Sequence, residues 1–314
     1  MPAHAPISLE VFHRVLEAAF QSLPSGASRL FHGRGHCYEG LSFINVDWFE
    51  PVVWVVIYGA VEDSLVASVA HRLRALAEAE PRVQCVSVQR RIKGRVQQEI
   101  VYGNMPGLCL AQEGGAVFEL NFSANQNIGF FLDARPGRQW LRRRAAGRRV
   151  LNLFAYTCSF SVAALAGGAS GVVNIDMARS AIATGQRNHA RNGLDLSRVR
   201  FLPHDIFRST RKLEDLGPYD LVVIDPPSRQ KGSFEADRDY GRLLCRLQPM
   251  LESDSEILAC LNAPYLDGQF LPQLFAEHLP GYQLAERLPQ REDFPERDLN
   301  CCLKMQVFRN MDTR

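Results

Sequence analysis

The chain has 314 residues, of which 46% are hydrophobic, and its formal net charge is +2. This length favours two domains, and the composition is that of a globular protein with a full hydrophobic core. The sequence lacks an apolar run of about eighteen residues and the N-terminus lacks a signal-peptide pattern, so we expect a cytoplasmic protein without a membrane partner.

The eight cysteines are scattered, and no Cys-x-x-Cys pair occurs. This pattern argues against a zinc or thioredoxin-like site and favours reduced, mostly buried thiols. His32, His36 and Cys37 are close enough in sequence to share a metal ion, but no second ligand pair is evident. We therefore interpret residues 31–36 as part of a glycine-rich structural loop and expect no metal.

The first third of the chain predicts a small α/β or α+β domain over residues 1–105, a candidate for RNA binding. Its apolar residues recur with helical or strand-like spacing. The expected elements, in chain order, are a helix over 8–23, strands over 42–49 and 51–58, a helix over 62–79 and a strand over 83–90.

Residues 106–314 predict a second domain, which begins with a hairpin over 107–122 and has its core over 149–314. The runs 108–113 and 116–122 flank a Gly-Gly turn, and 137–147 has helical spacing. From residue 149 short apolar strands alternate with helices, which predicts a mostly parallel sheet covered on both faces. The expected strands are 149–154, 171–176, 198–203, 219–224, 256–261, 282–288 and 300–309, and the expected helices are 159–167, 178–192, 205–215, 236–251 and 268–278.

Polar residues follow the first three of these strands, where a parallel sheet binds its ligands. The first strand leads into a turn of small and hydroxyl-bearing residues, 155–159, in place of the glycine motif that binds a dinucleotide pyrophosphate. Asp176 ends the second strand, where an acid can accept hydrogen bonds from ribose hydroxyls. Asp205 follows the third, where it can accept from an adenine amino group while Ile206 covers the ring. Each acid could instead cap a helix, but together they indicate an adenosine-containing ligand.

The fourth strand of this series ends in Asp225-Pro226-Pro227. Two prolines stiffen the chain in an extended conformation and remove two N–H donors. The carboxylate of Asp225 and the neighbouring carbonyls are then expected to face the ligand crevice.

With these residues, the stretch from 116 to 309 resembles the class I S-adenosylmethionine (SAM)-dependent RNA methyltransferases. It is most similar to the bacterial 23S ribosomal RNA enzymes that form 7-methylguanine and 5-methylcytosine. The resemblance implies a Rossmann-like seven-stranded sheet, SAM as cofactor, S-adenosylhomocysteine (SAH) as product and ribosomal RNA as partner. The residues that carry it are Asn127–Arg135, Leu151–Thr157, Asp176-Met177, Arg187-Asn188, Arg191–Gly193, His204-Asp205 and Asp225–Pro227.

The same resemblance implies a role for each matching residue in holding SAM. The stretch from Asn152 to Ser159 would wrap the methionine part, Asp176 would hold the ribose, and Asp205 with Ile206 would hold the adenine. The family usually has glycine where this chain has Cys158, which would weaken SAM binding. The remaining cofactor residues implied are Phe131, Asp133, Arg135, Phe154, Ala155, Tyr156, Thr157, Met177, Asn192 and Asp225.

Asp225, the Pro226 carbonyl and Asn262 would face the methyl group and the target base. Asn262 occupies the position where the 5-methylcytosine relatives have the cysteine that must first add to the pyrimidine. Cys260 lies in an apolar run and is interpreted as a core thiol, and Ser228 provides no aromatic ring to stack on a flipped base. By elimination a purine ring nitrogen, guanine N7 first, is the favoured acceptor.

Two arginine-rich runs could flank an RNA backbone, or could be ordinary solvated faces. One extends from Arg135 to Arg149, and the other contains Arg90, Arg91, Lys93 and Arg95. Phe294 could stack on a base. The rival hypotheses are a SAM enzyme acting on a small molecule or a protein, and a non-catalytic RNA-binding assembly factor that kept the fold. The oligomeric state stays open.

Overall fold

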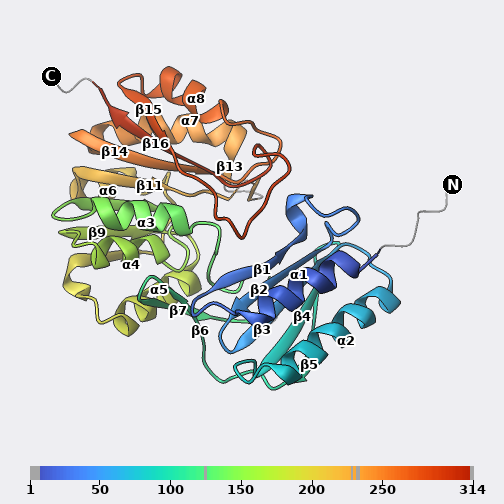
Figure 1. Cartoon of the computed structure of the whole chain (residues 1–314). Helices are drawn as coiled ribbons and strands as arrows, with labels where there is room; N and C mark the ends of the chain where they lie inside the picture. The colour runs from blue at the N-terminus through green and yellow to red at the C-terminus, as the bar shows by residue number, and fades with distance from the viewer. Residues whose placement is uncertain (1–7, 124–125, 228, 231–233, 312–314) are drawn as a thin grey trace. The chain divides into compact units, whose positions relative to one another are not determined.

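The computed structural model describes residues 8–123, 126–227, 229–230 and 234–311, so Ser228 lies outside the described residues. The chain divides into two compact units (Figure 1). Unit 1 comprises Met1–Leu132 and Glu292–Arg297, and unit 2 comprises Asp133–Arg291 and Asp298–Arg314. A segment late in the sequence thus belongs to the N-terminal unit.

Unit 1 is built on a five-stranded sheet of order β1-β2-β3-β4-β5, in which only β3 and β4 are parallel. Apolar residues of both helices and of the sheet form one core. Two of these strands were missing from the sequence prediction, because β1 lies in the segment interpreted as a loop and β5 is mostly polar and exposed. The elements are α1 (Glu10–Gln21), β1 (Ser28–His32), β2 (Ile44–Phe49), β3 (Val52–Tyr58), α2 (Asp63–Ala79), β4 (Cys85–Ile92) and β5 (Arg95–Gly103).

A hairpin of β6 (Cys109–Glu113) and β7 (Ala116–Leu120) completes unit 1. The backbone N–H of Ala27 donates to the Gln112 carbonyl at 2.8 Å. The ring of Phe122, just after β7, lies 4.8 Å from that of Trp54. These contacts place the hairpin in unit 1, so the proposed boundary at residue 105 falls about 27 residues before the division at residue 132.

Unit 2 contains the predicted seven-stranded sheet, of order β10-β9-β8-β11-β14-β16-β15. Strands β10, β9, β8, β11 and β14 are parallel, and β16 is antiparallel to both of its neighbours. The strands are β8 (Arg149–Leu153), β9 (Gly171–Ile175), β10 (Val199–Leu202), β11 (Tyr219–Ile224), β14 (Leu251–Leu261), β15 (Tyr282–Arg287) and β16 (Lys304–Asn310); β12 (Arg229–Gln230) and β13 (Phe234–Glu235) form a separate short pair.

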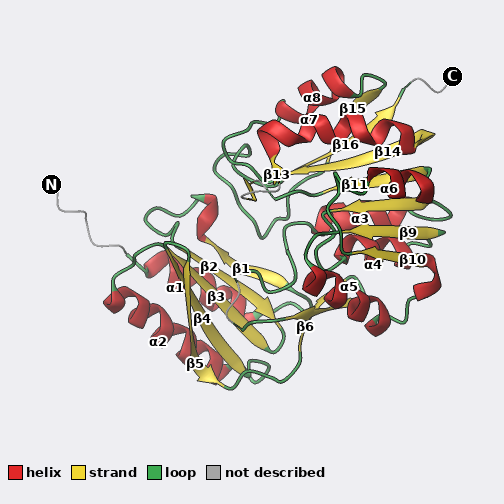
Figure 2. Cartoon of the chain, turned by 180° about the vertical axis from the view of Figure 1, so that it is seen from behind, coloured by secondary structure: helices red, strands yellow, loops and turns green. Residues whose placement is uncertain are grey.

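Helices cover both faces of this sheet, as the sequence pattern predicts (Figure 2). Alternate residues of each central strand enter two different cores: Leu151 packs with residues of α6, α7 and α8, whereas Val150 packs with residues of α3 and α4. No helix of the described residues is both long and apolar enough to cross a membrane. The helices are α3 (Arg135–Arg144), α4 (Ser159–Ala166), α5 (Arg179–Arg191), α6 (Thr210–Leu216), α7 (Ala236–Leu247) and α8 (Phe270–His278).

Candidate active site

The strand order of unit 2 brings the 154–159 turn and three of the predicted site residues, Asp176, Asp205 and Asp225, to one edge of the sheet. The last residues of four neighbouring strands are paired in register: Leu202 with Ile175, Ile175 with Leu153, and Leu153 with Ile224. The chain segments that leave these strands carry, in spatial order, Asp205, Asp176, the 154–159 turn and Asp225. Because neighbouring strands are about 4.8 Å apart, these groups form a row about 15 Å long.

The turn after β8 is unusually tight. Phe154, Tyr156 and Cys158 have φ angles of 54°, 46° and 62°, a region that non-glycine residues rarely adopt. Asp176 holds the turn: one carboxylate oxygen accepts from the Tyr156 N–H at 2.8 Å and the other from the Ala178 N–H at 2.8 Å. Backbone strain concentrates at ligand sites when neighbouring groups compensate for it. Asp176 is therefore a structural support of this turn in addition to its proposed contact with ribose.

Cys158 points away from the sheet edge and into the protein. Its side chain is fully buried, its thiol lies within hydrogen-bonding distance of the Tyr156 carbonyl, and burial raises its pKa. Helix α5 accommodates it through Gly185, since a Cβ atom at that position would lie 2.4 Å from the Cys158 sulfur. The cysteine therefore fills space behind the turn, and its effect on SAM would be indirect.

Asn152 also differs from its expected place, because its side chain is 1% exposed and lies within the sheet. Its amide donates to the Asn174 Oδ1 at 2.8 Å, and the Asn174 amide donates to the Ser161 hydroxyl at 3.0 Å. The buried Asn152 side chain therefore holds β8 to β9 through Asn174 and is not placed to contact SAM.

The hydrogen-bond chain from Asn152 continues through two further buried groups. The Ser161 hydroxyl lies 2.8 Å from the His189 Nε2, and the His189 Nδ1 lies 2.7 Å from the Gly185 carbonyl. A carbonyl can only accept, so Nδ1 carries the proton and the serine donates to Nε2. Burial lowers the pKa of His189, which agrees with a neutral ring. This one-directional chain links β8 and β9 to α4 and α5 beneath the strained turn.

The residues proposed for adenine and ribose are divided between surface and core. Met177 is 50% exposed beside Asp176, whereas Ile206 is 7% exposed and packs in the core. One Asp205 oxygen accepts from the Arg208 N–H at 3.0 Å, within the turn that precedes α6. Met177 is consequently the better candidate for the apolar contact with the adenine ring.

The turn residues and Asn192 are placed as follows. Phe154, Tyr156 and Ser159 are partly exposed, and Ala155 and Thr157 are buried. Asn192 follows α5 and donates to the Asn188 carbonyl at 2.7 Å. The fully buried Asn188, which was not among the predicted cofactor residues, donates to the Thr157 carbonyl at 3.0 Å and so supports the turn.

Asp225 follows β11 and is partly exposed beside the buried Cys260 and Arg138. The Cys260 thiol on β14 donates a hydrogen bond to its carboxylate, and Asp133 and Arg138 are close enough to act on it electrostatically. Burial, with the charge of Asp133, raises the pKa of Asp225 to about 7, although Arg138 acts in the opposite direction. The same burial raises the pKa of Cys260 well above that of a free thiol. Cys260 is therefore a neutral hydrogen-bond donor, and its core placement agrees with the sequence interpretation.

Asn262 is exposed and follows the end of β14. The segment after it is held by Lys304, whose ammonium donates to the carbonyls of Ala263 and Cys302, both at 3.2 Å, and to that of Asn300. Asn262 thus lies at the same edge as Asp225, on a firmly held segment.

Most of the Arg135–Arg149 run makes contacts within unit 2. Arg144 and Arg148 pair with the buried Glu256 at 3.4 and 2.9 Å, and Arg149 donates to Asp220 through its backbone N–H. Arg138 is 2% exposed. Arg142, Arg143 and Arg149 are exposed, so a contact of this run with an RNA backbone stays a prediction, to which the buried Arg138 does not contribute.

Phe294 belongs to unit 1, where it is 8% exposed beneath the Arg29 guanidinium, 4.3 Å from the ring centre. His32 packs beside it and contacts Glu296 at 3.0 Å. Phe294 is thus a packing residue in this structure and offers no free face for a base.

The described residues contain no group of three or more His, Cys, Asp or Glu side chains arranged to hold a metal ion.

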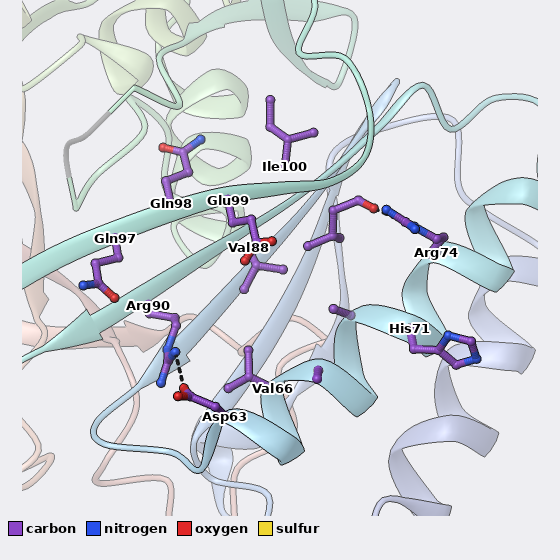
Figure 3. Close-up of a pocket in the computed structure, with 13 residues that line it drawn as sticks. Asp63, Val66, His71, Arg74, Val88, Arg90, Gln97, Gln98, Glu99 and Ile100 are labelled. Atoms are coloured by element: carbon purple, nitrogen blue, oxygen red, sulfur yellow. Dashed lines mark hydrogen bonds and ion pairs between the residues drawn. The ribbon is translucent and has the colours of Figure 1, made fainter.

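Unit 1 has a cavity of about 630 Å³ between α2 and the β4–β5 ribbon (Figure 3). Three of its charged groups have partners within the unit: Arg90 pairs with Asp63 at 2.7 Å, and Arg74 donates to the Val101 carbonyl at 2.8 Å. Of the predicted basic cluster, Arg91 donates to the Gln126 carbonyl, while Lys93 and Arg95 are exposed at the β4–β5 turn. The cavity contains none of the proposed cofactor residues.

Residues 28–309 match the family described as S-adenosylmethionine-dependent methyltransferase. The chain belongs to this family. SAM is therefore the cofactor of this methyltransferase. The roles of Asp205, Asp176, the 154–159 turn and Asp225 in holding its adenine, ribose, methionine and methyl group stay predictions.

Curated relatives of this methyltransferase act on RNA, by their names. Ribosomal RNA large subunit methyltransferase I of Aeromonas hydrophila is 35% identical over 145 residues, which cover 45% of this chain and 36% of the relative. Ribosomal RNA large subunit methyltransferase K/L of Shewanella baltica is 38% identical over 158 residues, covering 49% and 22%. The matches thus span well under half of each relative's own length.

Solved structures share the whole fold of this methyltransferase. A Streptococcus mutans protein assigned as a SAM-dependent methyltransferase has a TM-score of 0.82 at 23% identity, covering 98% of this chain and 83% of its own. A crystal structure with the same values contains SAH. At this identity the likeness establishes the fold alone.

Proposed function

We propose that this methyltransferase transfers the methyl group of SAM to a base of ribosomal RNA, with guanine N7 as the favoured acceptor and SAH as the product. The RNA assignment is supported by the names of the two ribosomal RNA relatives, which are 35% and 38% identical over 145 and 158 residues. Unit 1 is proposed as an RNA-binding domain, and unit 2 as the domain that carries the methyltransferase site.

The observation that carries the choice of acceptor is the state of Cys260. Methylation at carbon 5 of a pyrimidine needs an accessible thiolate that adds to the ring. The Cys260 side chain is fully buried and its thiol proton is held by Asp225, while the exposed residue at the end of the strand is Asn262. A ring nitrogen such as guanine N7 needs no such thiol.

The chemistry proposed is an in-line displacement, in which the chain contributes alignment. The lone pair of guanine N7 forms the new bond to the methyl carbon, and the bond between that carbon and sulfur breaks with its electron pair left on sulfur. No proton leaves the base in this step, so no general base is required. Asp225 and the Pro226 carbonyl would orient the base, and their negative character would stabilise the positive charge that develops on it.

Mass spectrometry of nucleosides tests this proposal. Ribosomal RNA from cells with and without the gene should differ by one methylated nucleoside, 7-methylguanosine. The wild-type gene and Asp215→Asn, an exposed control on α6, should restore it, and Asp225→Ala should not. If a different methylated nucleoside is lost, the acceptor atom is not guanine N7. If neither ribosomal nor transfer RNA changes, the RNA assignment is contradicted.

Binding experiments separate the two rival hypotheses. An enzyme of small molecules or proteins would show no RNA affinity that falls steeply with salt. A non-catalytic assembly factor that kept the fold would bind RNA but would show no transfer in vitro with any ribosomal RNA.

A further inference from the structure

Tyr265 is the one exposed aromatic side chain among the residues of unit 2 that the structure describes, and it is 62% exposed. It lies in the turn that follows β14. Strand β14 is the neighbour of β11, and its Ala259 pairs with Ile224, the last residue of β11. Because β14 continues to Leu261, this turn begins about 7 Å beyond the level at which Asp225 leaves the sheet. The turn that carries the ring is thus beside the Asp225 end of the candidate site.

The other aromatic candidates for contact with a base do not serve this end of the site. Residue 228, after the two prolines, is a serine, and Phe294 is buried beneath the Arg29 guanidinium. Phe131 is 43% exposed, but it belongs to unit 1. A base that is turned out of its stack loses its stacking contacts, and RNA-binding proteins replace them with an aromatic face. Tyr265 supplies such a face in unit 2.

The turn is held at both ends by β16 and the segment before it. The ammonium of Lys304, which is 8% exposed, donates to the Ala263 carbonyl at 3.2 Å. The Gly268 N–H donates to the Asn300 Oδ1 at 3.2 Å, and the Gln306 amide donates to the Gly268 carbonyl at 2.8 Å. A ring on such a supported turn loses little conformational freedom when a ligand binds, which favours its use as a binding face.

The charges near the ring favour a base over a phosphate. Asp267 is exposed on the same turn, and Asp298 is exposed on the segment that is hydrogen-bonded to it. Their carboxylates repel the phosphates of RNA, whereas an uncharged base can lie against an aromatic face. Leu299, which is 68% exposed beside Asp298, adds apolar surface.

We propose that Tyr265 stacks on the base that receives the methyl group and holds it beside Asp225. The inference rests on the proposed function, since it requires RNA as the substrate. Removal of an aromatic side chain that stacks on a base weakens binding about 5- to 100-fold. Tyr265 is not among the residues proposed for SAM, so its removal should act on the RNA and leave the affinity for SAM unchanged.

Methyl transfer in vitro by the full chain measures this effect. The probe is ribosomal RNA from cells that lack the gene, with SAM labelled in its methyl group. Tyr265→Ala should lower kcat/KM for this RNA about 5- to 100-fold, while the dissociation constant of SAM, measured by calorimetry, stays unchanged. Tyr265→Phe keeps the aromatic face and should retain kcat/KM within about twofold. Tyr265→Leu is apolar but has no such face, and should lose as much as the alanine variant.

Leu196→Ala is the matched control. Leu196 is 46% exposed in unit 2 but precedes β10, at the opposite end of the parallel strands, so this variant should behave as the wild type. Wild-type kcat/KM in Tyr265→Ala or Tyr265→Leu would overturn the inference, and is the result expected if the turn binds a protein instead. Equal losses in Tyr265→Phe and Tyr265→Ala would show that the hydroxyl is responsible, and stacking would be wrong. If the wild type transfers no methyl group to this RNA, the proposed function itself fails and the inference fails with it.

Discussion

Gly185 on α5 is the position where one added methyl group should disturb the cofactor turn most. A Cβ atom there would lie 2.4 Å from the sulfur of Cys158 and 3.0 Å from its Cβ, and the cysteine is fully buried and cannot move aside. Overpacking of this kind costs about 1–3 kcal/mol. Alanine gains about 1 kcal/mol over glycine inside a helix. We therefore expect Gly185→Ala to lower the free energy of unfolding by up to about 2 kcal/mol.

The overpacking cost of Gly185→Ala should vanish when Cys158 is replaced by glycine. Cys158→Gly removes a side chain from a φ of 62°, worth about 1–2 kcal/mol, and loses a buried thiol of similar worth, so alone it should be nearly neutral. In that background Gly185→Ala should raise the free energy of unfolding by about 1 kcal/mol, because only the helix preference remains. The coupling between the two sites is then about 1–3 kcal/mol.

Urea unfolding of the four proteins gives the double-mutant cycle, and hydrogen exchange of peptides over residues 154–192 assigns the change to unit 2. SAM affinity should fall in Gly185→Ala and recover in the double variant, since the turn is restored. The reasoning is refuted if Gly185→Ala has the same effect with and without Cys158.

Three further changes test the buried polar groups of unit 2. Ser161→Ala leaves the His189 Nε2 without its donor and should cost about 2–4 kcal/mol in urea unfolding; a cost below about 0.5 kcal/mol would contradict the hydrogen-bond chain. Glu256→Gln weakens ion pairs to three partly exposed arginines and should cost about 1–3 kcal/mol, a loss that should persist in high salt because the carboxylate is 3% exposed. Asp225 has a raised pKa in the folded protein, so its ionisation opposes folding. Relative to Asp225→Asn, the wild type should therefore lose stability as pH rises from 4 to about 7, with no further loss above pH 7. Parallel pH profiles of the two proteins would show that the pKa of Asp225 is not perturbed.

Local sequence pattern determined the layout of unit 2 and the chemistry of its edge. Alternating apolar strands and helices predicted the seven-stranded sheet, and Asp176, Asp205 and Asp225 were identified because each lies within three residues after the end of a strand. The family match confirms the methyltransferase assignment and the cofactor. Such signals are readable without a structure because they depend on residues that are neighbours in the chain.

The places of other side chains depended on contacts between residues that are far apart in the chain. Asn152 became a buried support because Asn174 lies opposite it in the adjacent strand, and Arg138 of the arginine-rich run is buried in unit 2. Phe294 became a packing residue because Arg29, distant in sequence, covers its ring. Burial and pairing of polar groups follow from these tertiary contacts, since a local pattern specifies which residues seek the interior but not which group each will meet there.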